Sequence, residues 1–260
     1  MMQHDGRLIF DGADGLSTSI PLHGRHEFIA SMDIAKRHDE SVLAIFQKRH
    51  IKFSDGRASS ILSLHELHII EGLDYVSLAS GIRERLEGVD YSNNIDLLID
   101  GDGVGEAVYD IMRQNEGLNP FKINATGGGA YRPIIEQTGD FKWIAGYSVP
   151  KKDLIDAQKV IMQQRRFHIP KEIPYQDKIE QQFKHYIATV TKAGNVIYGN
   201  DSEAQFDDIV YAFAMASWFF MTVEGASKDF MFKPKPDLGS GTTARGSAPT
   251  DAGYDPADVI

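Results

Sequence analysis

The sequence predicts an α/β fold with a mixed central sheet flanked by helices, and two features carry this prediction. Residues 26–70 contain three β-strand patterns in succession, separated by turn residues, which is typical of an antiparallel meander. Residues 95–116 then pass from a short apolar run through a glycine-rich turn into a helical periodicity. That strand–turn–helix order is typical of parallel α/β units, so we expect both kinds of strand pairing in one sheet.

The remaining elements follow from periodicity and from helix-start signals. We expect strands or extended segments at 26–35, 41–49, 60–70, 95–100, 121–125, 143–149, 167–170 and 195–198. We expect helices at 74–86, 104–116, 151–165, 175–187 and 205–223. The helix at 151–165 has the clearest start, because Pro150 precedes it and Asp153 lies in its first turn.

Composition divides the chain into three parts. Residues 1–25 are rich in glycine and are expected to form a flexible lead-in. Residues 26–232 contain nearly all the regular patterns and are expected to form one domain. From residue 233 the sequence consists mainly of Pro, Gly, Ser, Thr and Ala, so 233–260 is expected to be a disordered tail.

Charge and cysteine content narrow the possible functions. The formal net charge of −10 argues against non-specific, salt-driven adhesion to nucleic acid, but it allows a basic groove beside a cation-loaded acidic site. The chain has no cysteine, which excludes thiolate metal sites and cysteine nucleophiles and fits a reducing, intracellular setting. No apolar run reaches the roughly 18 residues that cross a bilayer, and the N-terminus does not resemble a signal peptide, so we expect no membrane partner.

The turn after the strand at 95–100 holds the first candidate functional residues. Asp100 and Asp102 alternate with glycines at the carboxyl end of this strand, the sheet edge where ligands collect in α/β folds. An ordinary turn explains the pattern about as well as a functional site does. A dinucleotide-binding turn fits poorly, because the glycine spacing departs from G-x-G-x-x-G. The third interpretation is a metal-binding strand end whose glycines let a phosphodiester backbone approach.

Two further groups of acids lie at the ends of expected elements. Asp33 ends the strand at 26–35, and Asp207 with Asp208 opens the last helix. Acids in a first helical turn stabilise the helix dipole by roughly 0.3–1 kcal/mol, so each group alone is more often structural than catalytic. Taken together, the strand-end acids and one helix acid supply the hard oxygen ligands for two divalent ions about 3.5–4 Å apart, the arrangement that hydrolyses phosphodiesters.

Five segments, in order, carry a family resemblance. They are ASMDIA at 30–35 with the following Asp39, LIDGDGVG at 98–105, KKDL at 151–154, FHIP at 167–170 and FDDIVYAFA at 206–214. They resemble, in turn, the first strand, the Asp-x-Thr-Gly-x-Gly segment, the K-x-x-L helix, the I-P segment and the His-Asp-Asp helix of one family. That family is the nuclease domain of the large terminase subunit of tailed bacteriophages, which has an RNase H-like fold.

The resemblance implies a metal-dependent endonuclease, with residues 26–232 as its RNase H-like domain, that cuts concatemeric viral DNA during genome packaging. It implies Asp33, Asp100 and Asp208 as catalytic, metal-binding acids, with Asp207 as an alternative or auxiliary ligand. The cofactor it implies is Mg²⁺ or Mn²⁺, as two ions. Asp102 stands where the family has Thr and is a candidate fourth carboxylate, and the usual His before the Asp pair is replaced by Phe206.

Basic residues near the acids are expected to contact DNA phosphates, namely Lys36, Arg37, Lys151 and Lys152. The resemblance implies double-stranded DNA, the packaging ATPase, the portal and the small terminase subunit as partners, at the procapsid in the host cytoplasm. No G-x-x-x-x-G-K-[ST] loop occurs, so we expect the motor on another polypeptide or removed from this one. Three alternatives stay open: a resolvase- or transposase-type nuclease, a non-catalytic motor-docking module and a nucleotide-binding protein.

Overall fold

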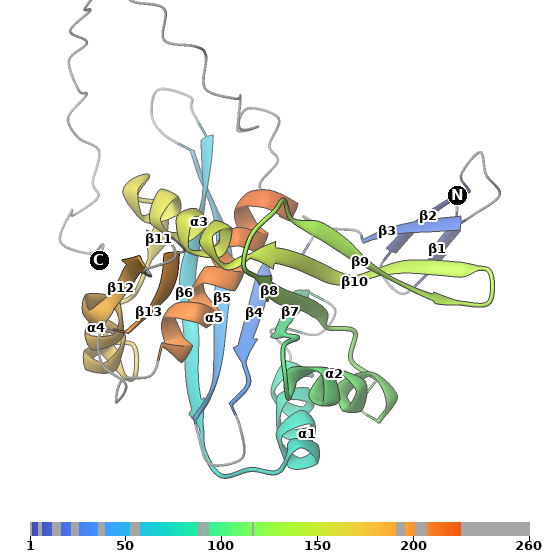
Figure 1. The fold of residues 1–260 in the computed structure, drawn as a ribbon, viewed down its shortest axis with the longest axis horizontal. Helices are drawn as coiled ribbons and strands as arrows, with labels where there is room; N and C mark the ends of the chain where they lie inside the picture. Colours follow the sequence, from blue (N-terminus) through green and yellow to red (C-terminus); the bar gives the residue numbers. More distant parts are fainter. Residues whose placement is uncertain are drawn as a thin grey trace, which may run out of the picture.

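The computed structural model describes residues 2–4, 7–11, 17–21, 26–35, 40–52, 58–87, 91, 94–115, 117–190, 196–200 and 207–224. These residues form a large mixed sheet, a two-stranded sheet and five α-helices (Figure 1). The tail expected at 233–260 lies outside the described residues. Among the described residues, no helix combines the length and apolarity that crossing a membrane requires.

The elements have the following bounds. The strands are β1 (Met2–His4), β2 (Arg7–Asp11), β3 (Ser17–Pro21), β4 (Phe28–Asp33), β5 (Ser41–Lys52), β6 (Ala58–Ile70), β7 (Ile95–Asp100), β8 (Phe121–Thr126), β9 (Arg132–Thr138), β10 (Phe141–Pro150), β11 (Phe167–His168), β12 (Tyr186–Val190) and β13 (Val196–Asn200). The helices are α1 (Tyr75–Leu86), α2 (Gly105–Gln114), α3 (Lys151–Gln163), α4 (Gln176–His185) and α5 (Asp208–Phe219), and α5 continues into the π-helical turn η1 (Phe220–Glu224).

The sheet is mixed, as the sequence predicts. Its strand order is β1-β2-β3-β10-β8-β7-β4-β5-β6-β11, and β9 pairs with β10 outside this path. The meander β4–β5–β6 is antiparallel, whereas β7 runs parallel to β4 and β8 runs parallel to β7. The strand β4 therefore lies in the middle of the sheet, with β7 on one side and β5 on the other. This central position suits its apolar sequence, which is buried on both faces.

The structure departs from the sequence prediction in three places. The strand β9 was not expected, because its side chains are mostly exposed and show no apolar alternation. The segment expected as a lead-in contains β1, β2 and β3, and β3 pairs with β10. The helix expected to end at residue 187 ends at His185, and Tyr186 begins β12. The division of the chain into domains stays a prediction.

Two hydrophobic cores form, one on each face of the sheet. One core joins β4, β7 and β8 to α3 and α5 through residues that include Ile29, Leu98 and Leu154. The other joins the opposite faces of β4 and β7 to α1 and α2 through residues that include Ile99 and Val108. The molecule therefore has three layers, with α3 and α5 on one face and α1 and α2 on the other (Figure 1).

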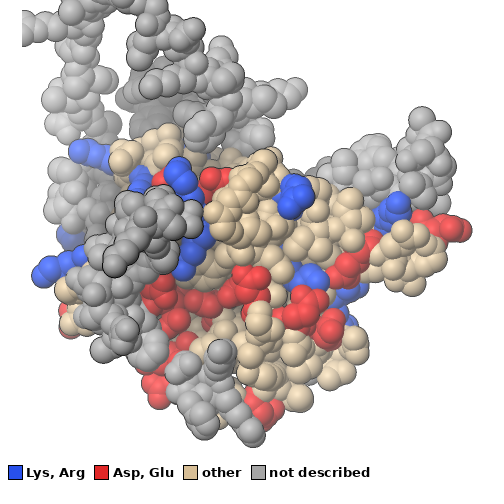
Figure 2. All heavy atoms as spheres, in the orientation of Figure 1, with Lys and Arg blue, Asp and Glu red and all other residues tan. Residues whose placement is uncertain are grey.

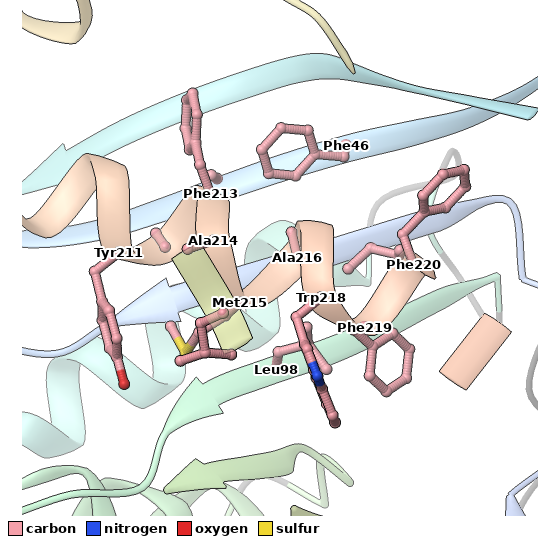
Figure 3. Packing of buried hydrophobic residues seen from close by; sticks show 14 of the residues in the cluster. Phe46, Leu98, Tyr211, Phe213, Ala214, Met215, Ala216, Trp218, Phe219 and Phe220 are labelled. Carbon is pink, nitrogen blue, oxygen red and sulfur yellow. The ribbon is translucent and has the colours of Figure 1, made fainter. Parts of the chain in front are cut away.

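The helix α5 is buried on all sides. Its residues from Ile209 onward are buried, as expected of a helix without a polar face that packs between a sheet and other helices. Phe213 packs edge-on against Phe46 of β5, with ring centroids 5.1 Å apart (Figure 3). Trp218 at its other end contacts Tyr147 of β10. This packing fixes the position of α5 on the sheet, and with it the position of the acids at its start.

The glycines of the turn after β7 are needed by the chain itself. A Cβ on Gly105 would lie 1.7 Å from the carbonyl oxygen of Asp100, and a Cβ on Gly101 would lie 2.3 Å from the side-chain oxygen of Asn124. Gly103 has a φ of 61°, which L side chains rarely adopt. Close packing of α2 on the end of β7 explains Gly105, side chains of β8 restrict Gly101, and the left-handed backbone explains Gly103, so the three glycines are explained without a ligand.

We expect Gly105→Ala to destabilise the protein by about 2 kcal/mol or more, because the new methyl group cannot fit beside the carbonyl of Asp100. The free energy of unfolding in urea measures the effect.

Gly81→Ala is the matched control, because Gly81 lies inside α1 and a Cβ there meets nothing within 4 Å. We expect this variant to be more stable than the wild type by roughly 0.5–1 kcal/mol, the usual gain from replacing a helical glycine. Equal stability of the two variants would contradict the close contact at Gly105.

Candidate metal centre

The strand ends bring Asp33 and Asp100 together. In the parallel pair β4–β7, Met32 lies opposite Ile99, so the last residues of the two strands, Asp33 and Asp100, lie side by side. Strand side chains alternate between faces, and Asp33 shares its face with Ile29 while Asp100 shares its face with Leu98, both members of the α5 core. Both acids therefore point to the face covered by α5.

The start of α5 supplies the second pair of acids. Asp207 is the N-cap of α5 and Asp208 its first residue. The backbone N–H of Ile209 donates a 2.9 Å hydrogen bond to the side-chain oxygen of Gln182, a buried residue of α4. This bond satisfies one of the free N–H groups of the helix start, and α5 also packs on β4. The sheet and α4 together hold the two acids in place.

The acids share one electrostatic environment. Burial raises the pKa of Asp33 well above its usual range, and the negative charges of Asp100, Asp208 and Asp207 raise it further. Burial raises the pKa of Asp100 to about 7. Burial, with the negative charge of Asp207, raises the pKa of Asp208 to about 6. Acids far apart in the sequence therefore oppose one another's ionisation, because they lie at one edge of the sheet.

Three residues that the sequence prediction omitted belong to the same environment. Glu40, just before β5, adds a negative charge that raises the pKa of Asp208, and it forms an ion pair with Lys178 of α4. Burial raises the pKa of the Tyr211 phenol, and the charges of Asp100 and Asp33 raise it further. Tyr211 follows Asp208 by one helical turn, a spacing that could have identified it. Glu40 precedes a strand antiparallel to β4, which is a weaker sequence signal for a residue of this cluster. No sequence signal identifies Lys178, because its position depends on tertiary packing alone.

The basic residues predicted to contact DNA have different surroundings. Lys151, the first residue of α3, places its Nζ 3.7 Å from the Oδ2 atom of Asp207 and 5.5 Å from the centre of the Tyr211 ring. Lys152 is exposed and pairs with Asp156 on its own helix. Lys36 and Arg37 lie outside the described residues. Figure 2 shows acidic side chains gathered across the centre of this face, with basic side chains bordering them.

Asp102 has a structural role in the turn after β7. Its Oδ2 atom accepts a 2.9 Å hydrogen bond from the backbone N–H of Ala125 in β8. Its own backbone N–H donates a 3.1 Å hydrogen bond to Asp100 Oδ1, which orients the Asp100 carboxylate. Asp102 thus links β7 to β8, and its role as a fourth metal ligand stays a prediction.

The donor set fits a hard divalent cation. The Oδ2 atom of Asp208 is buried and has no hydrogen-bond partner within the described part of the chain, although such an atom normally has one. Carboxylate oxygens are the ligands that Mg²⁺ and Mn²⁺ prefer. Among the described residues, however, no three His, Asp or Glu side chains are already grouped closely enough to hold a metal. A cation would therefore have to draw together carboxylates that otherwise repel one another.

No family model matches the sequence, and no curated protein is similar to it. Solved structures are similar in fold. The large terminase nuclease of thermophilic phage G20c with bound cobalt has a TM-score of 0.50 and 16% identity, over 83% of this chain and 88% of that chain. The same nuclease with bound magnesium has a TM-score of 0.49 and 17% identity, over 83% of this chain and 88% of that chain. The structure of this nuclease whose description names no metal has a TM-score of 0.48 and 16% identity, over 85% of this chain and 90% of that chain.

The likeness to the cobalt-bound structure extends over most of both chains. At this identity the likeness concerns the fold, and the fold is the one that the sequence predicts. The chain therefore has a mixed-sheet α/β fold like that of the cobalt-bound large terminase nuclease of phage G20c.

Proposed function

We propose that this protein is a metal-dependent endonuclease that cuts concatemeric viral DNA during genome packaging, by two-metal phosphodiester hydrolysis, and that residues 26–232 form its nuclease domain. The observation that carries the proposal is the convergence of acids from β4, β7 and α5 at one edge of the sheet. Lys151 and Lys178 offset only part of this negative charge, and buried carboxylates destabilise a fold unless further positive charge binds them, so a functional role explains their presence better than a structural one does.

Asp33, Asp100 and Asp208 are the proposed metal ligands, with Asp207 as an auxiliary ligand. When bound, two Mg²⁺ or Mn²⁺ ions activate water and stabilise the leaving oxygen of the phosphodiester. The strands β4 and β7 fix the backbone of Asp33 and Asp100, and Gln182 fixes the start of α5. Metal binding would therefore require only rotations of the acidic side chains, because the backbone positions are already set.

The proposed substrate is double-stranded DNA, held through its phosphates by basic residues beside the acids. Lys151 lies within the acid cluster, and Lys36 and Arg37 follow Asp33 in the sequence. Phosphate contacts carry no base information, so we expect little sequence preference. The packaging ATPase, the portal and the small terminase subunit are the proposed partners, at the procapsid in the host cytoplasm.

We expect Asp100→Asn to abolish Mn²⁺-dependent nicking of plasmid DNA while making the metal-free protein more stable at pH 8. The pKa of Asp100 is about 7 in the folded protein but near 4 in an unfolded chain. As the pH rises, the unfolded chain ionises first, so ionised Asp100 destabilises the fold above about pH 4. The neutral amide removes this penalty, and we expect a gain of roughly 1–3 kcal/mol in urea unfolding at pH 8 that disappears near pH 4.

Asp110→Asn is the matched control, because Asp110 is exposed on α2. We expect it to keep wild-type nicking and wild-type stability to within about 0.5 kcal/mol. If Asp100→Asn and Asp110→Asn nicked DNA equally well, the non-catalytic docking module would become the better explanation.

We expect the affinity for Mn²⁺ to rise between about pH 5 and pH 7 and then to level off. Metal binding requires ionised carboxylates, and the pKa values of Asp208 and Asp100 are about 6 and about 7. Calorimetric titration of the DNA-free protein with Mn²⁺ at several pH values measures this dependence. An affinity that stayed constant over this range would mean that these carboxylates do not bind the metal.

Substrate form separates the packaging nuclease from the resolvase-type alternative. We expect a linear duplex and a four-way junction of equal length to be cut at similar rates in Mn²⁺, since the proposed contacts are to phosphates. Cleavage timed on gels measures both rates. A strong preference for the junction would favour the resolvase, and ATP binding without cleavage would favour a nucleotide-binding protein.

A further inference from the structure

Lys151 is held in the acid cluster from two sides. It is the first residue of α3, so its backbone is fixed at the helix start. Its ammonium lies 3.7 Å from Asp207 Oδ2 and 5.5 Å from the centre of the Tyr211 ring, which is within the range of a cation–π contact. The Tyr211 side chain is itself only 7% exposed, on the buried helix α5, and gives the ammonium a fixed position.

The ammonium also acts on the two strand-end acids. The positive charge of Lys151 lowers the pKa of Asp33 and of Asp100, against the larger effect of burial, which raises both. Lys151 therefore lies near three of the four proposed metal-site acids. Lys178 acts on two other acids: it forms an ion pair with Glu40, and its positive charge lowers the pKa of Asp208.

A cation in this position has a consequence for metal binding. An ammonium and a divalent ion repel each other, and within a few ångströms at a partly buried site this repulsion changes binding measurably. The same carboxylates attract both cations. A divalent ion that binds Asp33, Asp100 and Asp207 must therefore either displace Lys151 or tolerate its charge.

We propose that Lys151 is a built-in counter-cation of the metal centre: in the DNA-free protein its ammonium neutralises part of the acid cluster and competes with the divalent ions. The inference rests on the proposed function, and it assigns Lys151 a role before DNA binds. The competition keeps the metal affinity of the free protein low. The ammonium that a metal displaces becomes available to a phosphate.

The test is calorimetric titration of the DNA-free protein with Mn²⁺ at pH 8, for the wild type and for Lys151→Gln. We expect the variant to bind Mn²⁺ more tightly, on the order of tenfold, because one positive charge has left the site. Lys151→Met removes the same charge with a different side chain and should give the same gain. Lys151→Arg keeps the charge and should restore an affinity near that of the wild type.

Lys159→Gln is the matched control, because it removes one charge from an exposed position two turns further along α3. We expect its Mn²⁺ affinity to equal that of the wild type, since a distant, solvated charge is screened. An unchanged or weaker Mn²⁺ affinity in both neutral variants of Lys151 would overturn this inference alone. A wild type that bound no Mn²⁺ would overturn the proposed function together with it.

Discussion

Repulsion among carboxylates that are partly withdrawn from water is the constraint on which the site depends. Asp33, Asp100 and Asp208 come from three elements, and burial raises the pKa of each, with a further rise from the negative charges of neighbouring acids. Two lysines of the described residues offset part of this charge: Lys151 pairs with Asp207, and Lys178 pairs with Glu40. A fold maintains such an arrangement only if other interactions offset the repulsion. A positively charged ligand then binds favourably, because it supplies the electrostatic stabilisation that the ligand-free protein lacks.

The apolar packing of α5 supplies that offset. The helix is buried on all sides, and its aromatic residues pack against β5, β8 and β10. Burial of a Phe or Leu side chain contributes about 1.5–3 kcal/mol, so a helix of this composition can hold two acids at its start against their repulsion. The apolar residues of α5 that follow Asp208 thus stabilise the position of the two acids at the start of the helix, Asp207 and Asp208.

The sequence predicts the parts of the site that local patterns encode. Asp33 and Asp100 end apolar strand runs, which a local pattern reveals, whereas the parallel pairing of β4 with β7 that brings them together is a feature of the tertiary fold. The positions of Lys178 and Gln182 depend on how α4 packs against α5, which no local pattern encodes. The strand β9 escaped prediction for another reason: its side chains are mostly solvated, and β10 specifies it through backbone pairing.

The glycine-rich turn after β7 resembles a nuclease motif, and its glycines are also explained by the packing of this chain. Gly101 and Gly105 are glycines because neighbouring atoms leave no room for a Cβ, and Asp102 ties the turn to β8. None of these contacts needs DNA or metal, yet together they fix the Asp100 backbone and orient its carboxylate. A carboxylate that is buried, repelled by its neighbours and held rigidly by its turn cannot relieve its charge by moving into solvent. Because the turn is rigid, this carboxylate is left to be stabilised by the Lys151 ammonium, by protonation or by a bound divalent cation.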